Sequence, residues 1–174
     1  MQFFVERIRT PIGSLLITHD GKALANIAFA DRQERREKEL ERDFPDAEVK
    51  RAPKPTNFAT VLARYFDGDI QAIDRLPVLD FGTDFQKRCW KALRRVAPGT
   101  TRTYGGHARA IGRPNAPRAV GAANGFNPIS IVVPCHRLVG ADGSLVHYGG
   151  GLERKRWLID HEAHYAGAEQ CPSE

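Results

Sequence analysis

The sequence predicts an α+β fold: a small amino-terminal antiparallel-sheet domain with helices, followed by a mainly helical domain. Two patterns predict this division. Short apolar runs separated by turn residues open the chain, whereas apolar residues at helical spacing dominate its second half. We therefore expect residues 1–79 to form a scaffold domain and residues 80–174 to form a second domain. The second domain is predicted to contain a helix-turn-helix and a short strand that leads to Cys135.

Three strands are expected at the start of the chain. The apolar runs 3–9, 14–19 and 24–30 are separated by Pro11-Ile12-Gly13 and by Asp20-Gly21, which are hairpin signals. The strands should therefore be antiparallel.

Two helices complete the expected first domain. Residues 33–44 are rich in charges and predict a helix with a broad solvated face, and residues 57–66 carry apolar side chains at helical spacing. Residues 50–55 contain two prolines and are interpreted as a connector. The extended stretch 76–82 is expected to hold the domain boundary.

The second half predicts four helices. Thr83 can cap a helix whose apolar stripe includes Cys89, so this cysteine is interpreted as a core residue. Residues 103–112 and the segment that opens at Pro117 predict two short helices joined by a turn rich in glycine and proline, which is typical of a helix-turn-helix. A last helix is expected from 152 to 161, and the tail from 166 to 174 is expected to be frayed.

Composition restricts the class of protein. The 174 residues are 41% hydrophobic and carry a formal net charge of +5, which allows a polyanionic partner without identifying one. The three cysteines have no paired spacing, which argues against a disulfide framework and favours a reducing cytosol. The sequence has neither a leader-like start nor a long apolar span, so we expect a cytoplasmic protein without membrane insertion.

Pro134-Cys135-His136-Arg137 carries the strongest chemical signal. The β-branched run 129–133 stops at this proline, so the expected strand would present the thiol at its end. A neighbouring histidine can raise the thiolate fraction, and the thiolate is the form that attacks carbon or binds a metal. An isolated Cys-His pair is more often inert, so the surrounding motifs must show whether this cysteine is reactive.

Those motifs are Arg118-Ala119-Val120-Gly121-Ala122-Ala123-Asn124-Gly125, then Asn127-Pro128, and finally Tyr148-Gly149-Gly150-Gly151-Leu152. Together with the cysteine motif they resemble the O6-alkylguanine-DNA alkyltransferase family, especially its bacterial members. The resemblance extends from about Thr83 to Glu162 without an evident gap, and it is looser before Thr83.

This resemblance implies a DNA repair protein that moves the alkyl group of O6-alkylguanine, and of O4-alkylthymine, to the sulfur of Cys135. His136 would deprotonate the thiol through a bound water, Glu162 would orient the histidine, and Tyr104 would donate a hydrogen bond to the leaving base. The thioether is stable, so we expect one irreversible turnover per molecule. We expect neither a cofactor nor a metal.

The resemblance also implies double-stranded DNA containing alkylated guanine as the partner. The O6 substituent is hidden inside a duplex, so the nucleotide must rotate out at a cost of roughly a few kcal/mol, and Arg118 would take its place. The helix that follows would lie in the minor groove. The expected DNA-binding residues are Arg118, Ala119, Gly121, Ala122 and Ala123. The expected pocket residues are Asn127, Pro134, Leu138, Tyr148 and Gly149.

Four positions depart from the family pattern. Val146-His147 stand where a small or hydroxyl residue followed by glycine or asparagine is common, and the larger side chains would narrow the pocket. Ser130 and Gly149 replace a proline and a serine of some members and would widen it. The preferred alkyl size is left open, as is clustering of the expected monomer on DNA.

Three other functions are weighed. A non-catalytic relative that binds alkylated DNA and recruits repair factors would lack the nucleophile, so Cys135 argues against it. A regulator switched by cysteine methylation would carry a cysteine-rich metal-binding domain, but no cysteine precedes Cys89. A cysteine hydrolase would not explain Arg118 and the helix-turn-helix.

Overall fold

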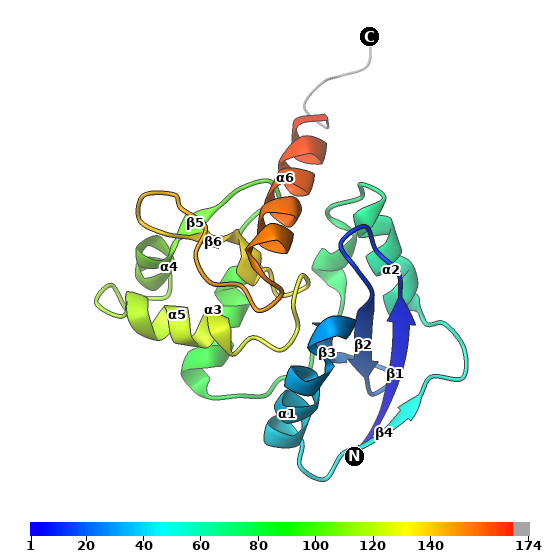
Figure 1. Cartoon of the computed structure of the whole chain (residues 1–174). Helices are drawn as coiled ribbons and strands as arrows, with labels where there is room; N and C mark the ends of the chain where they lie inside the picture. The colour runs from blue at the N-terminus through cyan, green and yellow to red at the C-terminus, as the bar shows by residue number, and fades with distance from the viewer. Residues whose placement is uncertain (169–174) are drawn as a thin grey trace. The chain divides into compact units, whose positions relative to one another are not determined.

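The computed structural model describes residues 1–168. It contains two compact units, one made of Met1–Gly82 with Pro128–Val132 and the other of Thr83–Asn127 with the chain from Val133 onward. A four-stranded sheet with helices forms the first unit, and helices dominate the second (Figure 1). The predicted α+β class, with an antiparallel-rich sheet in the amino-terminal part, is confirmed.

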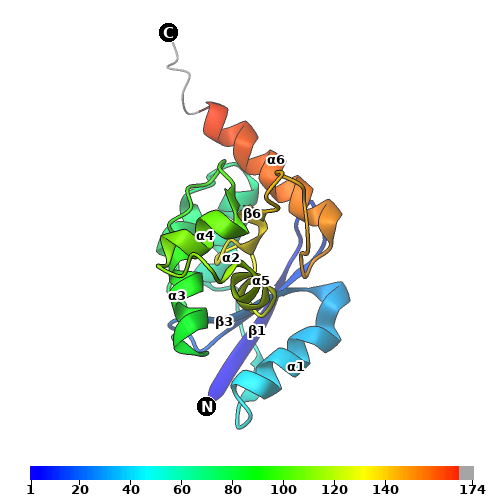
Figure 2. The same ribbon diagram turned by 90° about the vertical axis from the view of Figure 1, so that its left-hand side faces the viewer.

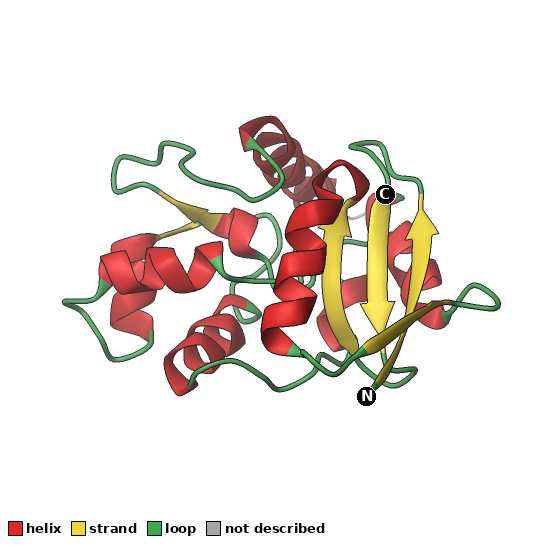
Figure 3. Ribbon diagram, turned by 60° about the horizontal axis from the view of Figure 1, so that its bottom comes forward, coloured by secondary structure: helices red, strands yellow, loops and turns green. Residues whose placement is uncertain are grey.

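The sheet has the strand order β3-β2-β1-β4. Strands β1 (Gln2–Ile8), β2 (Leu15–His19) and β3 (Leu24–Phe29) are antiparallel neighbours, with Glu6 opposite Ile17 on β2. The three predicted hairpin strands are therefore confirmed. Figure 3 shows the strands side by side.

The interpretation of residues 50–55 as a connector was wrong for Lys50 and Arg51, which belong to a strand. Strand β4 (Glu48–Arg51) pairs in parallel with β1, and the pairing continues as the Ala52 amide donates to the Val5 carbonyl at 2.9 Å. All four side chains of β4 are exposed. An edge strand held by backbone hydrogen bonds alone has no apolar alternation to reveal it.

Helices α1 (Gln33–Asp43) and α2 (Asn57–Phe66) confirm the two predicted in this part of the chain. Helix α1 packs against β3 and α2 packs against β1. The side chain of Thr56 caps α2 by accepting from the Phe58 amide. Fully buried side chains fill the core of the unit, and each contributes about 1.5–3 kcal/mol. The largest include Phe3, Leu15, Ile17, Leu62 and Tyr65.

Residues 129–133 do not form the predicted strand. Ile129 makes a single bridge to Ile27, whose amide donates to the Pro128 carbonyl at 2.9 Å. The chain then turns at Ile131, which has a φ of 75°. That conformation is rare for a β-branched residue, so a buried run of such residues gives no warning of the turn.

The second unit is built around α3 (Asp84–Leu93), α4 (Tyr104–Ala110) and α5 (Pro117–Gly125). Thr83 begins α3 with a full capping box, as its spacing to Gln86 allows. All three helices contact one another, and α3 and α4 lie beside α5 in Figure 2. The short strands β5 (Arg102–Thr103) and β6 (Leu138–Val139) pair in parallel.

Helix α6 (Leu152–Ala168) is longer than predicted. The helix continues past the expected end at His161, so that prediction was wrong. The expected fraying from residue 166 was also wrong for residues 166–168, which are helical. The rest of the expected tail, with Cys171, lies outside the described residues. Glu162 is consequently a mid-helix residue held by the helix backbone. None of the helices between residues 1 and 168 has the length and apolar character needed to span a membrane.

Candidate active site

Cys135 is the first residue of the 3₁₀ turn η3 (Cys135–Arg137), directly before β6. Its amide donates to the Val133 carbonyl at 2.8 Å, and its side chain is buried at 5% exposure. A tight turn followed at once by a paired strand fixes the backbone on the carboxyl side of the thiol. The turn also directs His136 and Arg137 inward, and both are buried.

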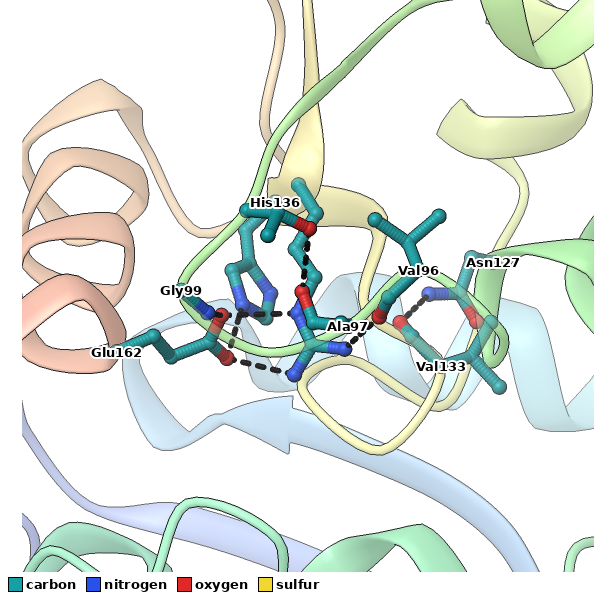
Figure 4. Close-up of polar contacts among 9 residues, drawn as sticks. Val96, Ala97, Gly99, Asn127, Val133, His136 and Glu162 are labelled. Atoms are coloured by element: carbon teal, nitrogen blue, oxygen red, sulfur yellow. Dashed lines mark hydrogen bonds and ion pairs between the residues drawn. The ribbon is translucent and has the colours of Figure 1, made fainter. Parts of the chain in front are cut away.

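His136 and Glu162 form a buried pair. The His136 Nε2 atom lies 2.8 Å from Glu162 Oε1, and the two residues are 0% and 1% exposed (Figure 4). Burial raises the pKa of Glu162, but the hydrogen bonds from His136 and Arg137 and the positive charge of Arg137 lower it more, and the pKa lies well below its ordinary value. Glu162 is therefore a carboxylate.

The pairing assigns the histidine tautomer. A carboxylate only accepts, so the proton lies on His136 Nε2 and Nδ1 keeps its lone pair. Within residues 1–168, this Nδ1 atom is buried and has no hydrogen-bond partner. Burial lowers the pKa of His136 and outweighs the opposing effect of Glu162, so the ring is neutral at pH 7. A neutral histidine with an open Nδ1, next in sequence to a cysteine, can serve as a base.

Arg137 holds the other side of the carboxylate. Its Nε and Nη2 atoms donate to the two oxygens of Glu162, each at 2.8 Å, and its Nη1 donates to the Val96 carbonyl. The Gly99 amide adds a bond of 3.3 Å to Glu162 Oε2. This role was missed, although Arg137 belongs to the cysteine motif, because only tertiary structure brings it to α6.

Tyr104 and Asn124 lie on the amino side of the cysteine turn. Tyr104 is the first residue of α4, whose Thr103 cap accepts from the Gly106 amide at 3.0 Å. Asn124 Nδ2 donates to Tyr104 Oη at 3.4 Å and to the Cys135 carbonyl at 3.3 Å. Burial raises the pKa of Tyr104, so the phenol keeps its proton at neutral pH.

Lys155 is a buried cation that the sequence interpretation missed. Its Nζ atom donates to the Val146 carbonyl at 2.7 Å and to the His147 carbonyl at 3.4 Å, and it lies 6.0 Å from the centre of the Tyr104 ring. Burial lowers the pKa of Lys155 to about 8, with Cys135 opposing the shift. Lysines in a charged helix are usually solvated, so the sequence carries no signal for this one.

The expected DNA-binding residues divide between two faces of α5. Arg118, Ala119 and Ala122 are exposed, and Pro117 occupies the first helical turn. Ala123 is buried, and its carbonyl accepts from Trp90 Nε1 at 2.9 Å. The prediction that Ala123 faces DNA was therefore wrong, because its helical position places it against α3.

Gly121 is half-buried beside Tyr104. A methyl group in place of its hydrogen would be 4.0 Å from the tyrosine ring, which is ordinary contact.

The expected pocket residues are distributed around the cysteine turn. Asn127 is buried and donates to the Val133 carbonyl at 2.8 Å, and the Tyr148 ring meets His136 edge-on with centroids 6.5 Å apart. Pro134 and Leu138 are buried, whereas Gly149 is exposed. Val146 and His147 meet Lys155 through their carbonyls, and the His147 side chain is exposed.

Cys89 provides an internal comparison. It is buried on α3, as predicted, and burial raises its pKa to about 11. Such a thiol stays protonated at neutral pH. In the described part of the chain, no three histidine, cysteine, aspartate or glutamate residues are grouped to hold a metal ion.

Two family models match the chain. Residues 4–80 match the ribonuclease-like domain of 6-O-methylguanine DNA methyltransferase, and residues 84–164 match the DNA binding domain of the same family. The chain belongs to the 6-O-methylguanine DNA methyltransferase family. The resemblance drawn from the cysteine motif is confirmed, and it extends over the amino-terminal part as well.

Members of the methyltransferase family align over nearly the whole chain. The methylated-DNA–protein-cysteine methyltransferase of Mycobacterium bovis is 43% identical over 166 residues, with 93% of each chain covered. The protein of that name from Shigella flexneri is 41% identical over 167 residues, covering 94% of this chain and 98% of its own.

Solved methyltransferase structures share the fold. The crystal structure of Mycobacterium tuberculosis O6-methylguanine methyltransferase superposes with a TM-score of 0.77 at 36% identity, covering 99% of this chain and 96% of its own. The Mycobacterium tuberculosis protein in complex with DNA gives 0.72 at 37% identity, covering 95% and 94%.

Proposed function

We propose that this protein repairs DNA by transferring the alkyl group of O6-alkylguanine to Sγ of its own Cys135. The observation that carries the proposal is the buried hydrogen bond between His136, next to Cys135, and Glu162. The histidine in this pair is neutral, and within residues 1–168 its Nδ1 atom has no hydrogen-bond partner and can accept a proton. The family membership supports the reaction, since relatives over 40% identical are named methylated-DNA–protein-cysteine methyltransferases.

The chemistry runs from thiol to thioether. His136 Nδ1 takes the proton of Cys135, across a bridging water as the family resemblance implies, and Glu162 stabilises the imidazolium that forms. The sulfur then attacks the alkyl carbon, a C–S bond forms, and the bond between that carbon and guanine O6 breaks. The electron pair stays on guanine, which takes up a proton to restore the base. Tyr104, protonated in its buried position, is the donor that faces this charge.

Lys155 supplies positive charge to the same step. Its ammonium group lies near Tyr104 and interacts favourably with ionised Cys135. A fixed cation in a site of low dielectric constant stabilises both the attacking thiolate and the developing anion on guanine. The thioether formed at Cys135 is chemically stable, so we expect each molecule to react once.

Double-stranded DNA is the proposed partner. Arg118, Ala119 and Ala122 share the exposed face of α5, which we assign as the second helix of a helix-turn-helix, and the small alanines allow a close approach to the minor groove. Arg118 would fill the space of the rotated nucleotide. A solved relative in complex with DNA supports this partner.

We assign a scaffold role to residues 1–79 and the catalytic and DNA-binding roles to residues 80–174. The family models support this division, since only the second is named for DNA binding. A cytoplasmic location is proposed for the protein because its free thiol needs reducing conditions.

The test is the stoichiometry of repair. Purified protein is titrated with a duplex that carries one O6-methylguanine, and the remaining modified base is quantified after digestion of the DNA. We expect repair to stop at one base per protein molecule, to vanish in Cys135→Ser and to persist in Cys89→Ser. Binding of the modified duplex without loss of the methyl group would contradict the proposal and indicate a damage-binding protein.

A further inference from the structure

Asn124 connects two groups of the proposed reaction. It lies on the buried side of α5 at 7% exposure, while Ala122 on the same helix is exposed. Its side-chain nitrogen reaches both the backbone carbonyl of Cys135 and the hydroxyl of Tyr104. A single side chain thus forms hydrogen bonds with both residues.

The two partners determine the orientation of the amide. The Cys135 carbonyl can only accept a hydrogen bond, so the NH₂ group of Asn124 must face it. An NH₂ group carries two hydrogens, and the second is directed at Tyr104 Oη. Tyr104 is therefore the acceptor in this contact, and its own hydroxyl hydrogen is available to another acceptor.

We propose that Asn124 is a positioning residue for alkyl transfer. Its side-chain NH₂ group donates a hydrogen bond to the Tyr104 oxygen, so that the phenol directs its own proton toward the leaving guanine. The inference rests on the proposed function. As the phenol donates its hydrogen bond to the leaving guanine, negative charge builds up on the Tyr104 oxygen. The hydrogen bond from Asn124 to this oxygen therefore strengthens. An interaction that strengthens in the transition state raises the rate constant rather than the affinity.

Two observations support a role beyond packing. Within residues 1–168, the Oδ1 atom of Asn124 is buried and has no hydrogen-bond partner. An unsatisfied acceptor lowers stability, and a leucine would fill similar volume without one, so stability alone does not explain an asparagine here. In addition, the Asn124 bond opposes the rise that burial causes in the pKa of Tyr104.

The experiment is a double-mutant cycle on the single-turnover rate constant. Methyl transfer from an O6-methylguanine duplex is followed by rapid quench at saturating protein for wild type, Asn124→Leu, Tyr104→Phe and the double variant. We expect Asn124→Leu to lower the rate constant roughly tenfold to a hundredfold, part of what a positioned proton donor contributes. In the Tyr104→Phe background the same substitution should change it less than about threefold, because the two residues act as a unit.

A second variant separates polarity from folding. Asn124→Asp keeps the size but offers acceptors only, so it cannot donate to the Cys135 carbonyl, and it should lose at least as much rate as Asn124→Leu. Iodoacetamide, which alkylates Cys135 without a guanine leaving group, should label the thiol of folded Asn124 variants at a rate within about threefold of wild type. Asn57→Ala, which removes an exposed asparagine of the other unit, is the matched control.

The outcomes are distinct. Equal losses in the wild-type and Tyr104→Phe backgrounds, or an unchanged rate constant in Asn124→Leu and Asn124→Asp, would overturn the positioning role. A matching fall in iodoacetamide labelling would also overturn it, because Asn124 would then act on the cysteine turn alone. Failure of the wild-type protein to transfer a methyl group would instead refute the proposed function.

Discussion

The carboxylate of Glu162 is shared by two neighbouring residues of one turn. His136 approaches one oxygen at 2.8 Å, and the Arg137 guanidinium donates to both. One residue of α6 thereby determines the histidine tautomer and anchors the turn that carries Cys135. Catalysis and local stability therefore depend on the same carboxylate.

Replacing Glu162 by glutamine should slow alkyl transfer. The amide can still accept from His136 Nε2, but it carries no charge to stabilise the imidazolium. We expect the single-turnover rate constant to fall about tenfold to a hundredfold, as for other residues that orient a functional histidine. Rapid-quench kinetics measure it, with Glu153→Gln on the exposed side of α6 as the control. An unchanged rate constant would show that Glu162 has no part in the reaction.

Acid should destabilise the protein through the same carboxylate. The pKa of Glu162 is lower in the folded chain than in the unfolded chain, so its contribution to stability is complete above about pH 4.5 and is lost as the pH falls toward the folded value. Each unit of difference is worth about 1.4 kcal/mol. Urea unfolding at several pH values should give a free energy that falls below pH 4.5 more steeply for wild type than for Glu162→Gln. Parallel curves would contradict the assignment.

The lysine beneath the Tyr104 ring should matter most below pH 8. Lys155→Met removes the cation, and we expect a loss of roughly tenfold in the rate constant at pH 7. The pKa of Lys155 is lowered to about 8, so above that pH the wild-type amine is itself neutral and the difference between the two proteins should shrink. Rate constants measured from pH 6.5 to 9.5 test this. A ratio that stays constant across that range would rule out an effect of charge.

Arg118→Ala should impair repair of duplex DNA selectively. Without a side chain to occupy the vacated position in the stack, the rotated nucleotide is less stable by roughly a few kcal/mol. We expect a loss of more than tenfold with duplex and a much smaller loss with single-stranded DNA carrying the same base. Arg32→Ala, an exposed arginine of the other unit, controls for charge. Equal losses on both substrates would assign Arg118 to phosphate binding instead.

Local signals in the sequence predicted most of the fold. The hairpin residues before Ser14 and Leu24 and the cap at Thr83 are read within a few positions along the chain, and the elements next to them form as expected. Strand β4 could not be predicted because its pairing uses backbone groups only. The turn at Ile131 could not be predicted because buried β-branched residues are typical of strands.

The candidate site was predicted where one motif or the family resemblance pointed to it. Cys135, His136 and Glu162 lie together in the structure, although Glu162 is 26 positions from the histidine. Lys155 and Asn124 gain their significance only from burial and from contacts across helices, which no spacing encodes. The same reason explains Ala123, whose inward position depends on the packing of α5 against α3.

Transfer of the alkyl group to one particular sulfur is tested most directly by intact-protein mass spectrometry with fragment mapping, after reaction with excess O6-methylguanine duplex. The proposed function predicts a gain of a single CH₂ group that maps to Cys135, is absent in Cys135→Ser and is unaffected by Cys89→Ser. A protein that binds the duplex and keeps its original mass, or that carries the added group on another residue, would contradict it.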